Sequence, residues 1–266
     1  MIECPLNYTG NKAKLIDQIL PMFPADIHRF VDLFCGGGTV GINVNADEHL
    51  YNDSLKPLIS LYNTFLNTDI ETLISDINSV IDKYKLSKEN KEGYLELRKH
   101  YNESRNDIEF YTLLIYCFSN IMRFNKKGEF NQTFGKRNFN PKLERKLRIF
   151  VDELKSQNAV FTSKDFEEFK AEPGDFIYLD PPYLISDAGY NGHNWTTADE
   201  KRLYRFLDNL DCKFALSNVL EHKGEKNDIL IDWSKKYNIH YLNADYHRVA
   251  RNTASQGTIE VLITNY

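Results

Sequence analysis

Asp180, Pro181, Pro182 and Tyr183 follow the strand-like segment DFIYL directly and could act together on an amino group. The amino group of an aromatic base is a poor nucleophile, because its lone pair is delocalised into the ring. A carboxylate and a backbone carbonyl can accept its two hydrogens and restore electron density on the nitrogen. Two prolines would fix the direction of the Pro181 carbonyl, and Tyr183 offers a flat face for an extruded base. The alternative is a diproline turn that only ends a strand.

A glycine-rich turn, DLFCGGGTVG, occupies residues 32–41. Glycines at the end of a strand let a ligand approach the backbone closely. Gly36, Gly38 and Gly41 fit the G-x-G-x-x-G spacing, and Asp53 ends the next strand-like segment, where a ribose hydroxyl would need an acceptor. The pattern favours an adenosine-bearing cofactor without separating nicotinamide from other cofactors. A tight strand-to-helix turn would need similar glycines.

The segment YTGNK, Tyr8 to Lys12, precedes an amphipathic segment, AKLIDQIL, that predicts a helix. Gly10 permits an unusual turn, Tyr8 offers a stacking face, and Lys12 carries a positive charge for a carboxylate. The alternative is that Asn11 caps the helix and Lys12 is solvated.

Residues 121–148 form a basic island, with nine Lys or Arg against two Glu. This net charge of +7 leaves −12 on the rest of the chain, because the whole chain carries −5. Interleaved aromatic residues such as Phe124 and Phe130 favour contact with nucleic-acid bases over a merely solvated surface. Arginine can donate twice to one guanine edge, whereas lysine suits phosphates. We therefore predict that bases are read by Arg123 and Arg137, and that phosphates are contacted by Lys126, Lys127 and Lys136.

The elements that would position these residues are short strands at both ends of the chain and helices between them. Segments rich in β-branched or aromatic residues predict strands within 28–34, 48–53, 159–163, 175–180, 212–218, 238–243 and 259–266. Helical spacing is clear over 70–85 and continues over 94–122, and TVGINVN predicts a helix after the glycine-rich turn. Gly128, between Phe124 and Phe130, predicts a hairpin. We expect an α/β unit interrupted by helices that pack against it.

Composition and cysteine usage limit the class of protein. A chain of 266 residues with 42% hydrophobic and 27% charged residues can bury a full core. Cys4, Cys35, Cys117 and Cys212 lie far apart with no C-x-x-C pair, and the seven histidines do not pair at metal-ligand spacing. The N-terminal segment lacks the apolar core of a signal peptide, so we expect no export signal, and no run of about 18 apolar residues occurs in the sequence. We expect a soluble cytoplasmic protein without a metal.

The order of YTGNK, DLFCGGG, a long helical insertion, DPPY, LSN (216–218) and EVLITNY resembles the Dam-type DNA adenine-N6 methyltransferases of the alpha group over nearly the whole chain. The resemblance implies a Rossmann-like methyltransferase sheet, mostly parallel with an antiparallel C-terminal strand. Residues 1–55 and 156–266 would form the catalytic domain. Residues 56–155 would form a helical target-recognition domain with a β-hairpin near 123–134.

The resemblance also implies methyl transfer from S-adenosyl-L-methionine to a flipped adenine of double-stranded DNA within GATC, leaving S-adenosyl-L-homocysteine. It implies catalysis by Asp180, Pro181, Pro182 and Tyr183. It implies cofactor binding by Tyr8, Lys12, Phe34, Cys35, Gly36, Asp53, Asp165, Phe166 and Asp180. Lys12 would face the methionine carboxylate, and Asp165 would contact the adenine ring or instead cap a helix. DNA contacts would come from Ser119, Arg123, Asn125, Lys126, Lys127, Lys136, Arg137 and Tyr190.

Four alternatives stay open. The target could be another adenine site or the N4 of cytosine, since DPPY suits any planar amine. The glycine-rich turn could belong to a NAD-dependent oxidoreductase. The chain could also be a non-catalytic DNA-binding subunit. For the methyltransferase we expect no membrane association and no obligatory protein partner, and activity in the cytoplasm of a bacterium or of a phage-infected host.

Overall fold

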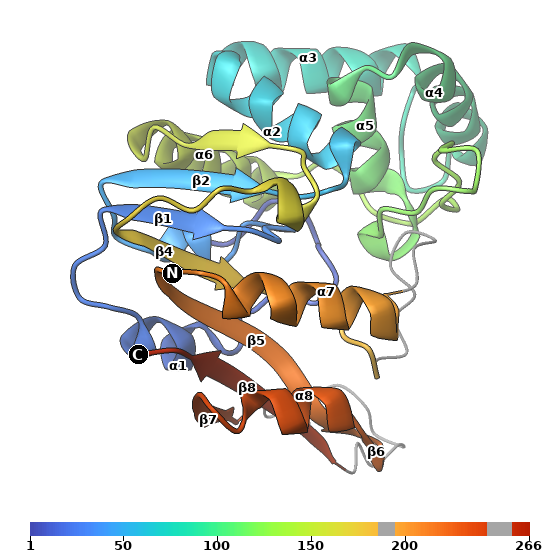
Figure 1. The fold of residues 1–266 in the computed structure, drawn as a ribbon. Coiled ribbons are helices and arrows are strands. Elements are labelled where there is room, and N and C mark those ends of the chain that lie inside the picture. Colours follow the sequence, from blue (N-terminus) through green and yellow to red (C-terminus); the bar gives the residue numbers. More distant parts are fainter. Residues whose placement is uncertain (186–194, 244–256) are drawn as a thin grey trace.

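A central sheet of eight strands organises the computed structural model, which describes residues 1–185, 195–243 and 257–266. Seven of the strands lie in the order β3-β2-β1-β4-β5-β8-β7, and β6 pairs with β5 (Figure 1). The strands are β1 Arg29–Asp32, β2 Glu48–Asn52, β3 Val160–Thr162, β4 Asp175–Leu179, β5 Lys213–His222, β6 Glu225–Lys226, β7 Asn238–Leu242 and β8 Thr258–Thr264. All seven predicted strand segments are confirmed. The short β6 was not predicted.

The direction of the strands also agrees with the predicted fold class. β3, β2, β1, β4 and β5 run parallel, whereas β8 runs antiparallel to both β5 and β7. The chain leaves β1 toward β2 on one side and later returns to β4 on the other side. In open sheets of this kind, ligands bind where the strand order reverses, outside the carboxyl ends of the strands. The switch point here lies between β1 and β4.

Helices cover both faces of the sheet (Figure 1). One face carries α1 (Ile16–Ile19), which continues as the 3-10 turn η1 (Leu20–Met22), and α6 (Pro141–Ser156). The other face carries α7 (Thr197–Asp208) and α8 (Asp228–Ser234). Alternate residues along β4 divide between the two faces, with Phe176 and Tyr178 in one core and Ile177 and Leu179 in the other.

The segment between β2 and α6 is helical, as predicted, and comprises α2 (Lys56–Asn67), α3 (Ile70–Lys83), α4 (Lys91–Ser104), α5 (Asp107–Tyr116) and the turn η3 (Phe118–Asn120). The predicted helix over 94–122 is broken at Arg105, whose φ is 57°, and Asn106 caps α5. The ring of Tyr62 in α2 stacks 4.9 Å from that of Phe161 in β3. The helices and the sheet therefore share one hydrophobic core.

The predicted hairpin is present, and α4 and its C-cap hold it. Phe124 and Phe130 form an antiparallel bridge, and Gly128 at the turn has a φ of 74°. Asn102 in α4 bonds both the N–H and the carbonyl of Phe130, and Arg105 donates to the carbonyl of Gly128. Phe130 is 1% exposed and packs on the aromatic core of the helices. The interleaved aromatics therefore anchor a hairpin too small to be stable alone, and their predicted role in base contact is wrong for Phe130.

Two predicted helices are shorter than expected. After YTGNK, α1 has four residues and passes into a 3-10 turn at Pro21. After the glycine-rich turn, the chain forms the 3-10 turn η2 (Gly41–Asn43) in place of the predicted helix. Another 3-10 turn near the cavity, η4 (Phe166–Glu168), lies further along the chain. The Asn43 side chain bonds the carbonyl of Thr39 and both backbone groups of Ile2, and such bonds compete with helix continuation.

Candidate active site

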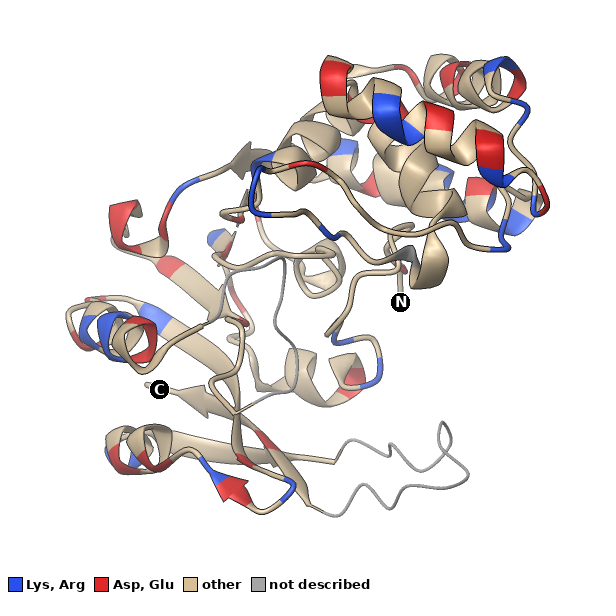
Figure 2. Ribbon diagram, turned by 90° about the vertical axis from the view of Figure 1, so that its right-hand side faces the viewer, with Lys and Arg blue, Asp and Glu red and all other residues tan. Residues whose placement is uncertain are grey.

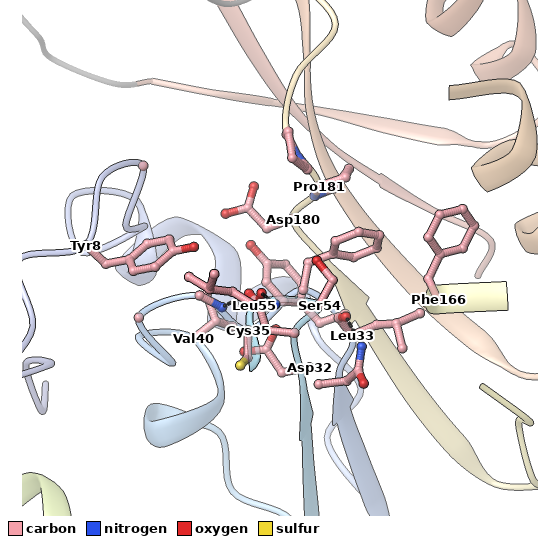
Figure 3. Close-up of a pocket in the computed structure, with 18 of the residues that line it drawn as sticks. Tyr8, Asp32, Leu33, Cys35, Val40, Ser54, Leu55, Phe166, Asp180 and Pro181 are labelled. Carbon is pink, nitrogen blue, oxygen red and sulfur yellow. Dashed lines mark hydrogen bonds between the residues drawn. The ribbon is translucent and has the colours of Figure 1, made fainter. Parts of the chain in front are cut away.

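A cavity of about 560 Å³ lies at the carboxyl ends of β1, β2 and β4, at the switch point of the sheet. Figure 3 shows Tyr8 and Asp180 toward one end of it, Phe166 at the other, and Leu33, Cys35 and Leu55 between them. All nine predicted cofactor-binding residues line this cavity, as do the four residues of the DPPY tetrapeptide. Segments far apart in the sequence therefore meet at one site.

The glycine-rich turn is shaped by the residues packed against it. Gly36 has a φ of 46°, and a Cβ there would lie 2.7 Å from the ring of Tyr8. A Cβ on Gly37 would also lie 2.9 Å from Tyr8. The hydroxyl of Tyr62, from α2, donates to the carbonyl of Gly36 over 2.9 Å. Glycine is required because the backbone is left-handed at Gly36 and because Tyr8 lies directly on the turn.

Asn52 joins the ends of three strands. Its side-chain amide donates to the carbonyls of Leu33 and Lys164, each over 3.1 Å, and its oxygen accepts from Thr162. The next residue, Asp53, accepts from the N–H groups of Gly36 and Leu55. Burial raises the pKa of Asp53, and these two amides oppose the rise. Asp53 was predicted from the sequence, whereas Asn52 was not.

Asp32 is a second carboxylate of the cavity that the sequence analysis did not single out. Its side chain is buried, and among the described residues its Oδ1 atom has no hydrogen-bond partner. Burial and the nearby charge of Asp180 raise the pKa of Asp32 well above its usual value. Its position at the end of β1, ahead of the glycines, was the signal available in the sequence.

The Asp180 carboxylate is bound to two other candidate residues. Lys12 Nζ lies 2.7 Å from each of its oxygens, and the Tyr183 hydroxyl donates to Oδ1 over 2.8 Å. Glu260, from β8, lies 3.6 Å from Lys12 Nζ and accepts from the Tyr183 hydroxyl over 3.4 Å. Lys12 is only 5% exposed, so the alternative of a solvated lysine is wrong. Glu260 begins the EVLITNY segment, but no role was predicted for it from the sequence.

At the opposite end of the cavity, aromatic rings surround Phe166. The rings of Phe34 and Trp195 lie 5.6 Å and 6.1 Å from it, and the guanidinium of Arg202 lies 5.0 Å over its face. Asp165 caps η4 through the N–H of Glu167 and also accepts from Arg202 over 2.9 Å. The alternative of a helix cap is thus realised at Asp165. Arg202, from α7, had no signal in the sequence.

Six of the eight predicted DNA-binding residues lie along the hairpin and the loop that follows it. Lys126, Lys127, Lys136 and Arg137 are exposed. Figure 2 shows basic positions on the loops beside the helices and both signs of charge on the helices themselves. Tyr190 lies outside the described residues.

Three other predicted DNA contacts have structural partners. Arg123 is exposed, and its Nε donates to Asn131 over 2.9 Å. The Asn125 side chain serves the hairpin turn, accepting from the N–H groups of Lys127 and Glu129. The Ser119 carbonyl accepts from Asn7 Nδ2 over 3.2 Å, which ties the loop before Tyr8 to the start of the hairpin region. Asn125 therefore shapes the hairpin whatever else it contacts.

The described residues hold no cluster of three or more His, Cys, Asp or Glu suited to a metal ion. Among the same residues, no helix is long and apolar enough to span a membrane.

The chain is similar in sequence to several proteins that are named as methyltransferases or methylases. The chain is 43% identical to the type II methyltransferase M.FokI of Planomicrobium okeanokoites over 278 residues, and 41% identical to the modification methylase StsI of Streptococcus sanguinis over 280 residues. Each match covers all of this chain, which spans 43% of the length of either relative. A DNA adenine methylase of Serratia marcescens is 26% identical, with 98% of this chain and 97% of that protein covered.

Residues 8–248 match the family described as "D12 class N6 adenine-specific DNA methyltransferase". This range includes the glycine-rich turn, the helical insertion, the hairpin and the DPPY tetrapeptide. The chain therefore belongs to the D12 class of N6 adenine-specific DNA methyltransferases.

Proposed function

We propose that this chain transfers a methyl group from S-adenosyl-L-methionine to the 6-amino nitrogen of an adenine extruded from double-stranded DNA. The observation that carries the proposal is the place of Asp180 in the wall of the cavity that the glycine-rich turn and Phe166 also line. An acceptor for an amino group and a site for an adenosine-bearing cofactor therefore share one space.

The hydrogen bonds of Asp180 leave room for a base. An ionised carboxylate has about four acceptor positions, two on each oxygen. Among the described residues, Oδ1 accepts from Lys12 and Tyr183, whereas Oδ2 accepts from Lys12 alone. Oδ2 can therefore accept one hydrogen of the adenine amino group without displacing Lys12. The Pro181 carbonyl would accept the other hydrogen.

Tyr183 supports this arrangement as a neutral phenol. Burial, together with the charges of Asp180 and Glu260, raises its pKa well above the usual value. The hydroxyl therefore keeps its proton and continues to donate to Asp180, while the ring remains a face on which the base can stack. As the nitrogen gains the methyl group it becomes positively charged, and the neighbouring carboxylate favours this charge before a proton leaves.

The cavity suits S-adenosyl-L-methionine on two counts. Asp32 presents a buried oxygen without a partner among the described residues, and the methionine part of the cofactor carries an ammonium that could donate to it. Phe166 offers an apolar wall for the adenine ring, and Asp53 offers a carboxylate for the ribose hydroxyls. When bound, the cofactor supplies a methyl carbon on a positively charged sulfur, so the chain needs to provide position and electrostatics.

The raised pKa of Asp32 predicts a pH dependence of cofactor binding. An ammonium binds the ionised carboxylate, whereas burial favours the protonated form in the free protein. Affinity for S-adenosylhomocysteine should therefore weaken as the pH falls, by up to about tenfold per unit below the pKa of Asp32. Asp32→Asn should bind weakly at high pH and lose this slope. Titration calorimetry at several pH values measures it, and equal slopes in both proteins would contradict the role of Asp32.

We propose that DNA lies against the basic hairpin and its following loop, with Arg123 and Arg137 at base edges and the lysines at phosphates. The support is the exposure of these side chains beside the helices that hold the hairpin in place. A local basic surface can bind one backbone even though the whole chain carries −5.

Arg137→Ala should cost more sequence preference than affinity. We expect the binding free energy to fall by about 1–3 kcal/mol on a duplex that carries the target sequence, and to change little on a duplex of scrambled sequence. The adjacent Lys136→Ala is the matched control. It should weaken binding to both duplexes and lower the salt dependence, because it removes a phosphate contact. Fluorescence anisotropy at several salt concentrations compares the two variants. Equal losses on both duplexes for Arg137→Ala would assign it to the backbone.

Methylation of plasmid DNA from a host without adenine methylation tests the function as a whole. We propose GATC as the first target to examine, on the resemblance to Dam-type enzymes. Nucleoside mass spectrometry should detect N6-methyladenine after incubation with S-adenosylmethionine, and mapping the modified sites gives the sequence. Methylation at other sites would overturn GATC only, whereas binding of cofactor and DNA without transfer would overturn the proposed activity.

Membership of an adenine-specific methyltransferase family overturns two alternatives, the NAD-dependent oxidoreductase and cytosine-N4 methylation. The relatives M.FokI and StsI are named as a methyltransferase and a modification methylase, and we propose a comparable role in restriction–modification for this chain. We also propose that it acts in the cytoplasm without an obligatory protein partner.

A further inference from the structure

We propose that Glu200 is a positioning residue for the cofactor, because its carboxylate holds the indole of Trp195 in the wall of the cavity. This inference rests on the proposed function. Glu200 lies in the first turns of α7 and its side chain is fully buried. Burial of a carboxylate costs folding free energy unless hydrogen bonds compensate for the lost hydration, so the hydrogen-bond partners of Glu200 indicate its role.

The two oxygens of Glu200 have different partners. Oε1 accepts from the Tyr204 hydroxyl over 2.5 Å, from Asn227 over 2.9 Å and from Asn218 over 3.4 Å. These partners come from α7, from the N-cap of α8 and from β5. Oε2 accepts from Trp195 Nε1 alone among the described residues, over 2.5 Å. Oε1 therefore links α7, α8 and β5, whereas Oε2 bonds the side chain of Trp195.

Trp195 is a wall of the cavity. It lies edge-on to Phe34 at 5.9 Å, with an angle of 82° between the rings, and it packs against Phe166 at 6.1 Å. Phe34 directly precedes Cys35 and Gly36 of the glycine-rich turn. An indole can turn about two side-chain bonds, and the bond to Glu200 fixes its plane. The three rings then form a preorganised apolar end for the cofactor.

In this proposal Glu200 acts on the cofactor through Trp195 and Phe166 and does not touch the target base. Loss of the Oε2 bond should raise the KM for S-adenosylmethionine and leave kcat nearly unchanged, because the Asp180 end of the cavity is intact. A purely structural role would instead lower stability without a selective loss of cofactor affinity.

The test compares Glu200→Gln with Tyr204→Phe. Glu200→Gln replaces the carboxylate that accepts from the indole N–H with an amide, whose NH₂ group can face that N–H and cannot accept from it. The second removes a comparably buried donor from Oε1 but keeps the bond to Trp195. Both are made in a Trp233→Phe background, because the chain has two tryptophans and Trp195 is then the only one, whose emission is excited selectively at a wavelength that tyrosine does not absorb. Trp195→Phe provides a third variant that keeps an aromatic ring without the N–H.

Glu200→Gln and Trp195→Phe should each weaken binding of S-adenosylhomocysteine about tenfold, and the double variant should be no weaker than either one. Trp195 emission should shift to the red and become more accessible to acrylamide in Glu200→Gln. Tyr204→Phe should lose a similar amount of thermal stability yet keep wild-type affinity and emission.

Equal affinity losses in Glu200→Gln and Tyr204→Phe would overturn the inference, as would unchanged affinity in Trp195→Phe. Failure of the wild-type protein to bind S-adenosylhomocysteine would instead overturn the proposed function. The emission and acrylamide measurements need no ligand, so they would still report whether Glu200 holds Trp195.

Discussion

Asp180→Ala should lower the rate of methyl transfer by about 10³-fold or more while DNA binding stays within a few-fold of wild type. The carboxylate lies in the cavity wall, and in the proposed mechanism its Oδ2 atom accepts a hydrogen of the amino group. Without it, the lone pair of the nitrogen stays delocalised into the ring. In the proposed DNA interface the affinity comes mainly from the basic hairpin, so DNA binding should persist.

The neighbouring charges explain why this variant should still fold. Lys12 loses its closest partner, but Glu260 remains 3.6 Å from Nζ. Asp180→Asn is the matched control, since its amide oxygen can accept one hydrogen in the same place. We expect it to retain more activity than Asp180→Ala. Single-turnover transfer of a labelled methyl group measures the rates, and a near-normal rate for Asp180→Ala would reject the acceptor mechanism.

Lys12→Met should have the second-largest effect, with transfer about 10²-fold slower and the fold destabilised by about 3 kcal/mol. The ammonium lies between Asp180 and Glu260; Lys12 and Glu260 are each 5% exposed, and Asp180 is 18% exposed. Removing Lys12 leaves two carboxylates close together, one of them buried, without the cation between them. Repulsion from Glu260 would then turn the Asp180 carboxylate away from the position in which its oxygen faces the base.

Binding of S-adenosylhomocysteine to the same variant separates two roles of Lys12. If its main partner is Asp180, as the 2.7 Å contacts indicate, affinity should change little. If it mainly faces the methionine carboxylate, affinity should fall together with the rate. Lys14→Met, two residues further along on an exposed position, is the control and should leave both quantities near wild type. Unchanged turnover in Lys12→Met would exclude both roles, the contact with Asp180 and the contact with the methionine carboxylate.

Local sequence patterns determined much of this protein. Runs of β-branched and aromatic residues located seven strands, because a strand buried in a sheet needs such residues on both faces. The DPPY tetrapeptide and the glycine-rich turn follow two of these strands, β4 and β1, and parallel strands bring their carboxyl ends to one edge. The sequence therefore predicted that these two motifs would meet at one edge of the sheet, where they line one cavity.

The partners within the site were decided only by the tertiary structure. Lys12 and Asp180 are separated by 168 residues, and Tyr183 and Glu260 by 77. Their contacts depend on the order β1-β4-β5-β8 in the sheet. The same is true of Phe130, which looked suited to DNA but turns into the helical core. A periodic pattern shows which face of an element is apolar. Which element covers that face is decided by long-range packing, and a local pattern does not specify it.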